Sequence, residues 1–178
     1  MTMQAQVAQI SKKVEKHRVN APIVAIGSEG LATMYMNKVA QKKRTDTTLL
    51  FGDQCDAALL DELLTAQNFC AANGDGFHKV YFTLKEGGVG IDYPSTDAIN
   101  KSGGNIVIVC IKPTSYSQLC QFRRRTARMG APGTVIYILV GNSNGEDPNY
   151  LRVLENTLKE RELQDVLSLY LKIRNAEH

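Results

Sequence analysis

The chain has 178 residues, of which 43% are hydrophobic and 22% charged, as expected for one ordinary globular domain. No apolar run reaches the roughly 18 to 20 residues of a membrane span, and the first residues lack the apolar core of a secretory signal. A net charge of +3 is too small to imply a polyanionic partner by itself. We therefore expect a cytoplasmic protein, with peripheral attachment to a membrane as a second option.

Hydrophobic periodicity predicts helices and strands in alternation. The predicted helices cover residues 3–18, 28–42, 55–70, 115–129 and 149–174. The predicted strands cover residues 22–27, 47–51, 79–84, 106–111 and 134–140. Ser28 is placed as the N-cap of the second helix. A stripe of leucines predicts a buried face on the third helix and consists of Leu59, Leu60, Leu63 and Leu64.

Most of the predicted strands are continuously apolar and separated by helices. This pattern predicts an α/β domain with a mainly parallel sheet of about five strands and helices on both faces. The connection over residues 85–105 is unusually long and begins at the carboxyl end of a strand, where ligands bind in such sheets. The four cysteines have no CxxC spacing and do not pair with histidines at zinc-ligand spacing, so we expect buried free thiols and no metal site.

The segment QFRRRTARMGAPG, residues 121–133, holds four arginines within six residues. On a helix, Gln121, Arg125 and Arg128 share one face, while Phe122 and Thr126 lie on the side of the core. Because guanidinium groups donate paired hydrogen bonds to phosphate, the stripe could bind a triphosphate. Spacing alone favours a solvated helix face over a phosphate site, and a nucleic-acid patch is disfavoured because no aromatic residues are interleaved with the basic ones.

Two segments resemble a known pair of motifs. QFRRRTARMGAPG resembles the sixth motif of superfamily-2 helicases and translocases, in the form QxRGRxGRxGxPG of SecA-like ATPases. The matching positions are Gln121, Arg123, Arg125, Arg128, Gly130, Pro132 and Gly133. Residues 83–109 resemble the fifth motif, with matches at Gly88, Gly90 and Asp92, and the Gly103–Gly104 pair is also SecA-like. The segment RVNAPIVAIGSE, residues 18–29, is similar to the fourth-motif strand, so the resemblance covers about residues 21–140.

The resemblance implies a three-layer RecA-like domain of the P-loop NTPase type, the second of two such domains that close over ATP. It implies that Arg128 is an arginine finger and that Arg125 contacts the same phosphate. Gln121 and Asp92 would meet the nucleotide, or in the case of Asp92 the opposite domain. Gly88 and Gly90 would allow close backbone approach. ATP and Mg²⁺ would be bound mainly by the first RecA-like domain, which this sequence does not contain.

The sequence departs from the family at several positions. No GxxxxGK[ST] motif is present, so we expect the chain alone not to hydrolyse ATP. Arg124 and Ala127 replace glycines of the sixth motif, and Val89 replaces an arginine of the fifth. We expect an N-terminal helix at 1–20, the RecA-like domain at 21–142, and a C-terminal helix at 143–178 that packs on the domain or on a missing neighbour. The chain would be part of a longer motor or a stand-alone relic.

The leading hypothesis is the second motor domain of a SecA-like protein translocase. Its partners would be the first RecA-like domain of the same parent protein, and unfolded polypeptide or a translocation machinery. One alternative is the C-terminal half of an RNA or DNA helicase, with nucleic acid as its partner. The other alternative is a degenerate, non-catalytic interaction domain.

Overall fold

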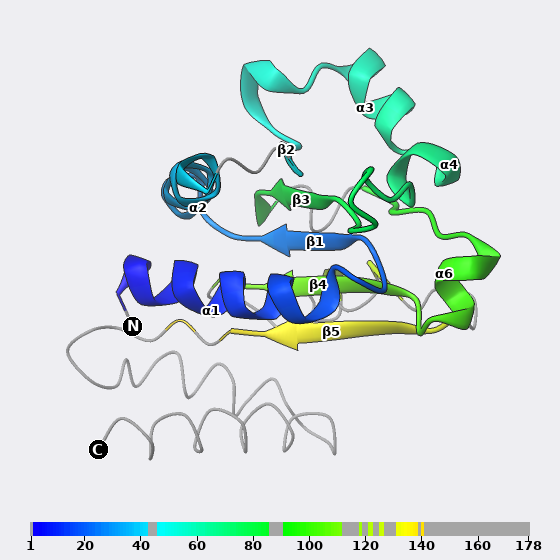
Figure 1. The fold of residues 1–178 in the computed structure, drawn as a ribbon. Coiled ribbons are helices and arrows are strands. Elements are labelled where there is room, and N and C mark those ends of the chain that lie inside the picture. The colour runs from blue at the N-terminus through cyan, green and yellow to red at the C-terminus, as the bar shows by residue number, and fades with distance from the viewer. Residues whose placement is uncertain are drawn as a thin grey trace.

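The fold is centred on a parallel sheet of five strands in the order β2-β3-β1-β4-β5 (Figure 1). The computed structural model describes residues 2–42, 46–85, 91–111, 118, 121–122, 125–126, 131–138 and 140. The strands are β1 Ile23–Ile26, β2 Thr47–Leu49, β3 Val80–Thr83, β4 Asn105–Val109 and β5 Gly133–Tyr137. All four pairings between neighbouring strands are parallel, so the predicted α/β class is confirmed.

The three central strands carry the core. Every residue of β1, β3 and β4 is buried, whereas β2 and β5 are only partly covered. Parallel strands that are covered on both faces are apolar throughout, which is why these runs could be recognised in the sequence. The predicted strand limits differ from the observed ones by at most three residues.

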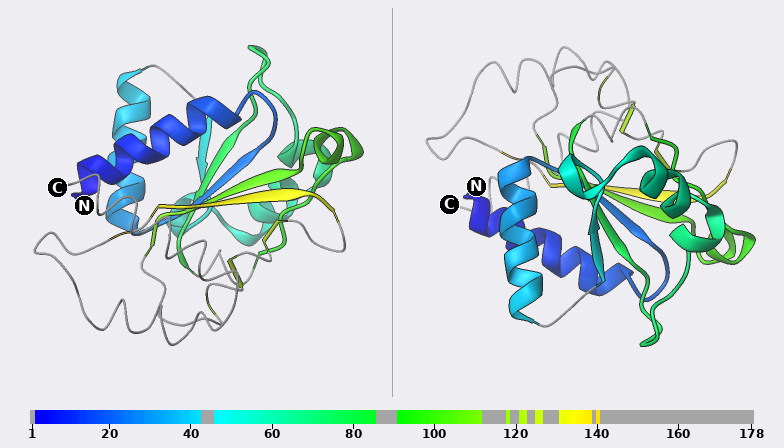
Figure 2. Two further views of the ribbon diagram at one scale, coloured as in Figure 1. Left: turned by 90° about the horizontal axis from the view of Figure 1, so that it is seen from below. Right: turned by 90° about the horizontal axis from the view of Figure 1, so that it is seen from above.

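Two helices cover one face of the sheet, and both begin at a side-chain cap. Thr2 caps α1, Met3–His17, by accepting a hydrogen bond from the Ala5 amide, and Ser28 caps α2, Glu29–Gln41, by accepting one from the Leu31 amide. Figures 1 and 2 show α1 and α2 on the same side of the sheet. The buried residues of the two helices are Val7, Ile10, Val14, Leu31, Ala32, Tyr35 and Val39. The predicted Ser28 cap is therefore confirmed.

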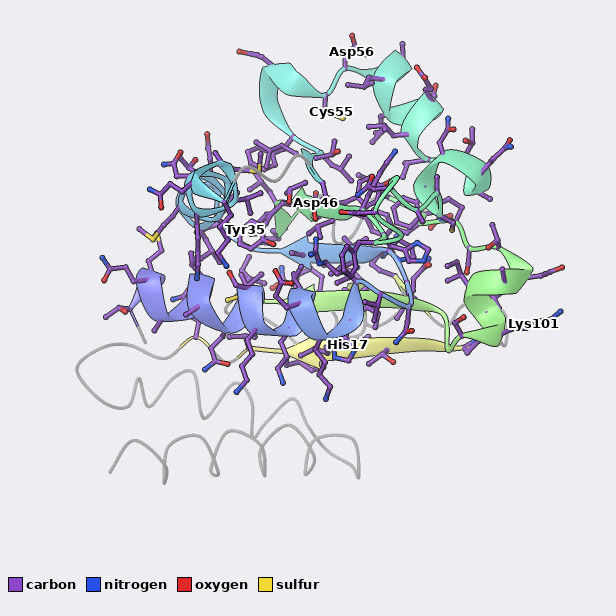
Figure 3. All side chains as sticks on the ribbon, in the orientation of Figure 1. His17, Tyr35, Asp46, Cys55, Asp56 and Lys101 are labelled. Atoms are coloured by element: carbon purple, nitrogen blue, oxygen red, sulfur yellow. The ribbon has the colours of Figure 1, made fainter. Side chains whose placement is uncertain are left out.

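Neighbouring residues of β3 show that both faces are covered. Side chains alternate between faces along a strand, so Tyr81 and Phe82 point to opposite sides. The Phe82 ring lies 5.8 Å from that of Tyr35, which extends from α2 toward the sheet (Figure 3). The Tyr81 ring stacks at 4.4 Å on Phe69 of α4, Ala66–Phe69, and its hydroxyl donates to the Phe69 carbonyl oxygen. The predicted helical layers on both faces are confirmed.

The prediction of a single helix over residues 55–70 is wrong. The segment instead forms a 3₁₀ turn, η1 Gly52–Gln54, and two short helices, α3 Ala57–Leu63 and α4. Asp56 caps α3 and Thr65 starts α4 afresh by accepting a hydrogen bond from the Asn68 amide, so two N-caps divide the segment. The predicted leucine stripe is only partly buried: Leu60, Leu63 and Leu64 pack against the core, whereas Leu59 is 37% exposed.

The start of the sheet is fixed by a buried cation at the end of α1. Arg18 is 8% exposed and forms an ion pair with the buried Asp46, which precedes β2. Its guanidinium lies 4.0 Å from the centre of the Phe77 ring, and its carbonyl oxygen accepts a hydrogen bond from the His78 amide. Residues before β1, β2 and β3 are thus held together by one side chain.

The cysteines of the described segments agree with the prediction of free thiols. Cys70 and Cys110 are buried, Cys55 is half-buried, and all three are free. Burial raises the pKa of the Cys110 thiol to about 12, so it stays protonated at neutral pH. No helix in the described part of the chain has the length and apolar character that a membrane crossing requires. The C-terminal helix predicted at 149–174 lies outside the described residues.

Candidate functional site

Arg125 joins two of the segments singled out by the sequence. Its Nη1 donates to the carbonyl oxygen of Ile91 at 2.7 Å and lies 3.4 Å from Oδ1 of Asp92. Its Nε donates to the carbonyl oxygen of Gln121 at 3.1 Å. The structure therefore brings together three of the predicted site residues, Gln121, Arg125 and Asp92.

The geometry around Arg125 corrects the predicted helix over residues 115–129. Residues 118, 121 and 122 are helical, but Arg125 lies in a turn, where its amide donates to the Phe122 carbonyl oxygen only three residues back. The side chain then folds onto the Gln121 carbonyl oxygen, which a continuing helix would have used in its own backbone ladder. The helical stripe therefore does not continue through Arg125. Phe122 and Thr126 are buried, as predicted.

The contacts of Arg125 differ in strength. Its side chain is 10% exposed, whereas that of Asp92 is 74% exposed, so the ion pair at 3.4 Å is mostly screened by solvent. The two backbone carbonyl oxygens are therefore the main anchors. A guanidinium has five N–H donors, and the described contacts involve only Nε and Nη1. The two Nη2 donors have no hydrogen-bond partner among the described residues and are left for an added acceptor.

Thr126 and Asn105 extend the same junction, and sequence reasoning missed this role of both. The Thr126 hydroxyl donates to the Asn105 carbonyl oxygen at 2.9 Å, and Asn105 Nδ2 donates to the Pro94 carbonyl oxygen at 2.7 Å. Asn105 is 3% exposed, and its Oδ1 has no partner among the described residues. A buried, unpaired carbonyl costs about 1–3 kcal/mol. The only available signal was a polar residue opening the otherwise apolar run NIVIV.

Tyr93 holds the segment between Ile91 and Thr96 against the sheet. Its ring stacks on Phe69 at 5.8 Å, on the face that Tyr81 also occupies. Burial raises the pKa of the Tyr93 phenol, while the charge of Arg125 acts in the opposite direction. Burial dominates, so Tyr93 is a neutral phenol at physiological pH and packs as an aromatic residue.

The Gly103–Gly104 pair and the Pro132–Gly133 pair, which both belong to the resembling segments, lie in contact. Gly104 has a φ of +82°, and a Cβ atom built on it would lie 1.8 Å from the carbonyl oxygen of Pro132. Gly103 also has a positive φ, of +106°, but a Cβ atom there would meet nothing within 4 Å. The close approach between β4 and the start of β5 therefore requires glycine at position 104.

Several predicted site residues fall outside the described residues. These are Gly88, Gly90 and Arg128, together with the unmatched neighbours Val89, Arg124 and Ala127. Within the described segments, no group of three or more His, Cys, Asp and Glu side chains could hold a metal ion.

Comparison with known proteins identifies the fold. No model of a known protein family and no curated protein sequence matches this chain. Among solved structures, the chain is similar to the C-terminal domain of S. cerevisiae Dbp5, solved as a variant bound to a Gle1 variant and IP6. The TM-score is 0.51 and the identity 14%, over 94% of this chain and 80% of that chain.

The C-terminal part of the Fun30 ATPase domain is also similar, with a TM-score of 0.49 and 13% identity over 97% of this chain and 54% of that chain. The chain thus spans about half of the Fun30 structure, and a TM-score this low carries no argument. The Dbp5 likeness is one of fold. This chain has the RecA-like α/β fold.

Proposed function

We propose that this chain acts as the second RecA-like domain of a superfamily-2 ATPase and supplies arginines to an ATP site that another RecA-like domain completes. The observation that carries the proposal is the junction at Arg125. The guanidinium is held by the Ile91 and Gln121 carbonyl oxygens and lies near Asp92, in the two segments that resemble the fifth and sixth motifs, and no described residue uses its Nη2 donors. A fixed arginine with free donors suits an anionic ligand, because little freedom is lost on binding.

In this proposal the two arginines have different tasks. Arg128 is the arginine finger, which stabilises negative charge on the γ-phosphate as the bond to it breaks. Arg125 holds the Asp92 segment in place and offers its Nη2 donors to the same phosphate group. Gln121, Gly88, Gly90 and Asp92 approach the nucleotide. Because the sequence has no phosphate loop, ATP and Mg²⁺ are held mainly by the first RecA-like domain.

We further propose the SecA-like form of this motor, with unfolded polypeptide as the transported substrate. The contact between Gly104 and Pro132 supports this choice. The Gly103–Gly104 pair and the Pro-Gly end of the sixth motif are both SecA-like features of the sequence, and they form one contact between backbone segments. The proposal also places the domain limits at 20/21 and 142/143. The buried residues of α1 belong to the same hydrophobic core as the sheet.

The experiment is an ATPase assay of the assembled protein, in which this sequence is combined with its phosphate-loop domain. Arg128→Ala is expected to lower kcat by on the order of 10³-fold, as for other arginine fingers, with little change in the KM for ATP. Lys101→Ala removes an exposed charge from α6, Asp97–Lys101 (Figure 3), and is the matched control that leaves turnover unchanged. Full turnover by Arg128→Ala would exclude the finger role.

The substrate class is tested with the same assembly. Unfolded polypeptide should stimulate turnover, and single-stranded RNA or DNA should not. Stimulation by nucleic acid alone, with an affinity that falls steeply with salt, would instead identify a helicase. An assembly that binds no ATP would favour the non-catalytic interaction domain.

A further inference from the structure

Three segments that are distant in the sequence are joined pairwise by hydrogen bonds near the start of β4. The side-chain Nδ2 of Asn105 donates to the Pro94 carbonyl oxygen at 2.7 Å, and the Thr126 hydroxyl donates to the Asn105 carbonyl oxygen at 2.9 Å. Arg125, the neighbour of Thr126, closes the circuit with its bond of 2.7 Å to Ile91, three residues before Pro94. We call this closed circuit the β4 triangle.

The β4 triangle has one rigid corner. Asn105 begins a strand in which every residue is buried, and β4 is paired on both sides, with β1 and with β5. The other two corners lie on chain segments outside the sheet. In a closed triangle, an outer corner cannot move within the plane without changing the length of at least one of the bonds that meet there, so both outer segments are positioned relative to Asn105.

Asn105 is suited to this task by its two bonding groups. Its side chain donates to one outer segment while its backbone oxygen accepts from the other. The residue is nine-tenths buried or more, and its Oδ1 has no partner among the described residues. The side chain therefore serves through its donor to Pro94. An apolar residue, as at the other positions of β4, would leave that carbonyl oxygen without this bond.

A second contact anchors the chain beyond the arginines to the same place. Gly104, directly before Asn105, is in close backbone contact with Pro132. Thr126 and Pro132 are thus both fixed to Gly104–Asn105, and Arg128 lies between these two anchors in the sequence.

We infer that Asn105 and Thr126 are positioning residues, which hold the Asp92 segment and the arginine segment in one fixed relation through the start of β4. The inference rests on the proposed function for its catalytic consequence, but the coupling itself is a property of this chain. Neither residue is assigned a contact with nucleotide. Their effect passes through Arg125 and the Ile91–Pro94 segment.

The coupling is tested on the chain itself by hydrogen exchange of backbone amides, followed by mass spectrometry. Thr126→Val removes the hydroxyl at nearly constant volume and is expected to raise exchange several-fold at residues 91–96, although the hydrogen bond that is lost goes to Asn105. Thr126→Ser keeps the hydroxyl and should behave like the unchanged protein. Thr33→Val is the matched control, because it removes a similar bond, from the Thr33 hydroxyl to the Glu29 carbonyl oxygen, on α2.

The reciprocal variant protects the test against a failure to fold. Asn105→Leu removes the donor to Pro94 and should raise exchange at residues 121–126 as well as at 91–96. The coupling is refuted if, among the variants that fold, Thr126→Val raises exchange only at residues 121–126 and Asn105→Leu only at residues 91–96. It is also refuted if Thr126→Ser resembles Thr126→Val.

The catalytic consequence is tested in the assembled ATPase. Thr126→Val and Asn105→Leu should lower kcat by about tenfold to a hundredfold, as expected for a small misplacement of reacting groups, with the KM for ATP nearly unchanged. Thr126→Ser should restore kcat. Full kcat in a variant with raised exchange would refute the positioning role and leave the proposed function standing, whereas an unchanged protein without turnover would refute the proposed function alone.

Discussion

Gly104 and Pro132 approach so closely that a Cβ atom on Gly104 would lie 1.8 Å from the Pro132 carbonyl oxygen and 2.4 Å from its carbonyl carbon. The obstacle is backbone, which cannot rotate away as a side chain can. The contact lies at the start of β4, and β5 begins directly after Pro132. A glycine in the sequence is here a condition for pairing two strands.

Gly104→Ala is therefore expected to destabilise the fold by more than about 3 kcal/mol, since the cost of a positive φ adds to that of separating two backbones. Gly103→Ala is the matched control, because Gly103 has a positive φ and open space around it. It should cost only about 1–2 kcal/mol. Urea unfolding followed by circular dichroism measures both, and equal losses would contradict a specific clash at Gly104.

Arg125→Met should cost about 2 kcal/mol, because it leaves the Ile91 and Gln121 carbonyl oxygens without their donor. Asp92→Asn should change stability by less than about 1 kcal/mol, because the Asp92 side chain is 74% exposed. The comparison of the two unfolding curves separates anchoring by backbone oxygens from anchoring by the ion pair. A larger loss for Asp92→Asn would reverse the order of importance given above.

Asp46→Ala should cost about 3 kcal/mol, because it removes the buried partner of the Arg18 guanidinium and leaves only the partly exposed Glu15 carboxylate at 3.4 Å. The double variant Arg18→Met with Asp46→Leu should lose less than Asp46→Ala alone, since no unpaired charge is left. Asp61→Ala, an exposed position on α3, is the control with little effect. A double variant as unstable as the single one would show that packing against Phe77 matters more than charge.

The imidazole of His78 makes stability depend on pH. Burial lowers the pKa of His78 from its ordinary value of 6.5, and the hydrogen bond to the Cys70 carbonyl oxygen only partly opposes this. The folded protein binds the proton less tightly than the unfolded chain, so this contribution to stability is present above pH 6.5 and is lost as the pH falls below it.

His78→Asn keeps a donor for Cys70 but does not titrate. Between about pH 7.5 and about pH 5.5 the variant should therefore lose less stability than the unchanged protein, by about 1–2 °C in Tm, a small difference because the ring is half exposed. Thermal unfolding at a series of pH values measures the difference. Parallel Tm profiles for the two proteins would contradict the role of His78. Burial also lowers the pKa of His17, so part of the pH dependence persists in the variant.

The sequence predicts the sheet well because the signals for it are local. β1 is a continuous apolar run between Pro22 and Gly27, and Ser28 follows where its hydroxyl can cap the next helix. The leucine stripe of residues 59–64 misled for the opposite reason. Four leucines on one helical face look the same whether they are covered fully or in part, and only the three-dimensional structure shows that Leu59 stays exposed while the other three are half-buried.

The site could be predicted only where a distinctive residue type marks it in the sequence. Asp92 was found because it matches a motif, and the Gly103–Gly104 pair because glycine is distinctive. The bonds from Arg125 to Ile91 and from Thr126 to Asn105 end on backbone oxygens, which every residue has. No sequence pattern marks such an acceptor, so the β4 triangle could not be predicted from the sequence.

The hydroxyl of Tyr81 specifies the alignment of β3. Sliding a strand by one residue exchanges its two faces, and in β3 one such slip would place the Tyr81 ring where the Phe82 ring now packs. Apolar burial distinguishes the two alignments, because Val80 would then lie in the place of Tyr81, and the hydroxyl adds to the difference. The bond of 3.1 Å from the Tyr81 hydroxyl to the Phe69 carbonyl oxygen exists in only one of them. One polar atom in an apolar strand thus favours the native alignment of β3.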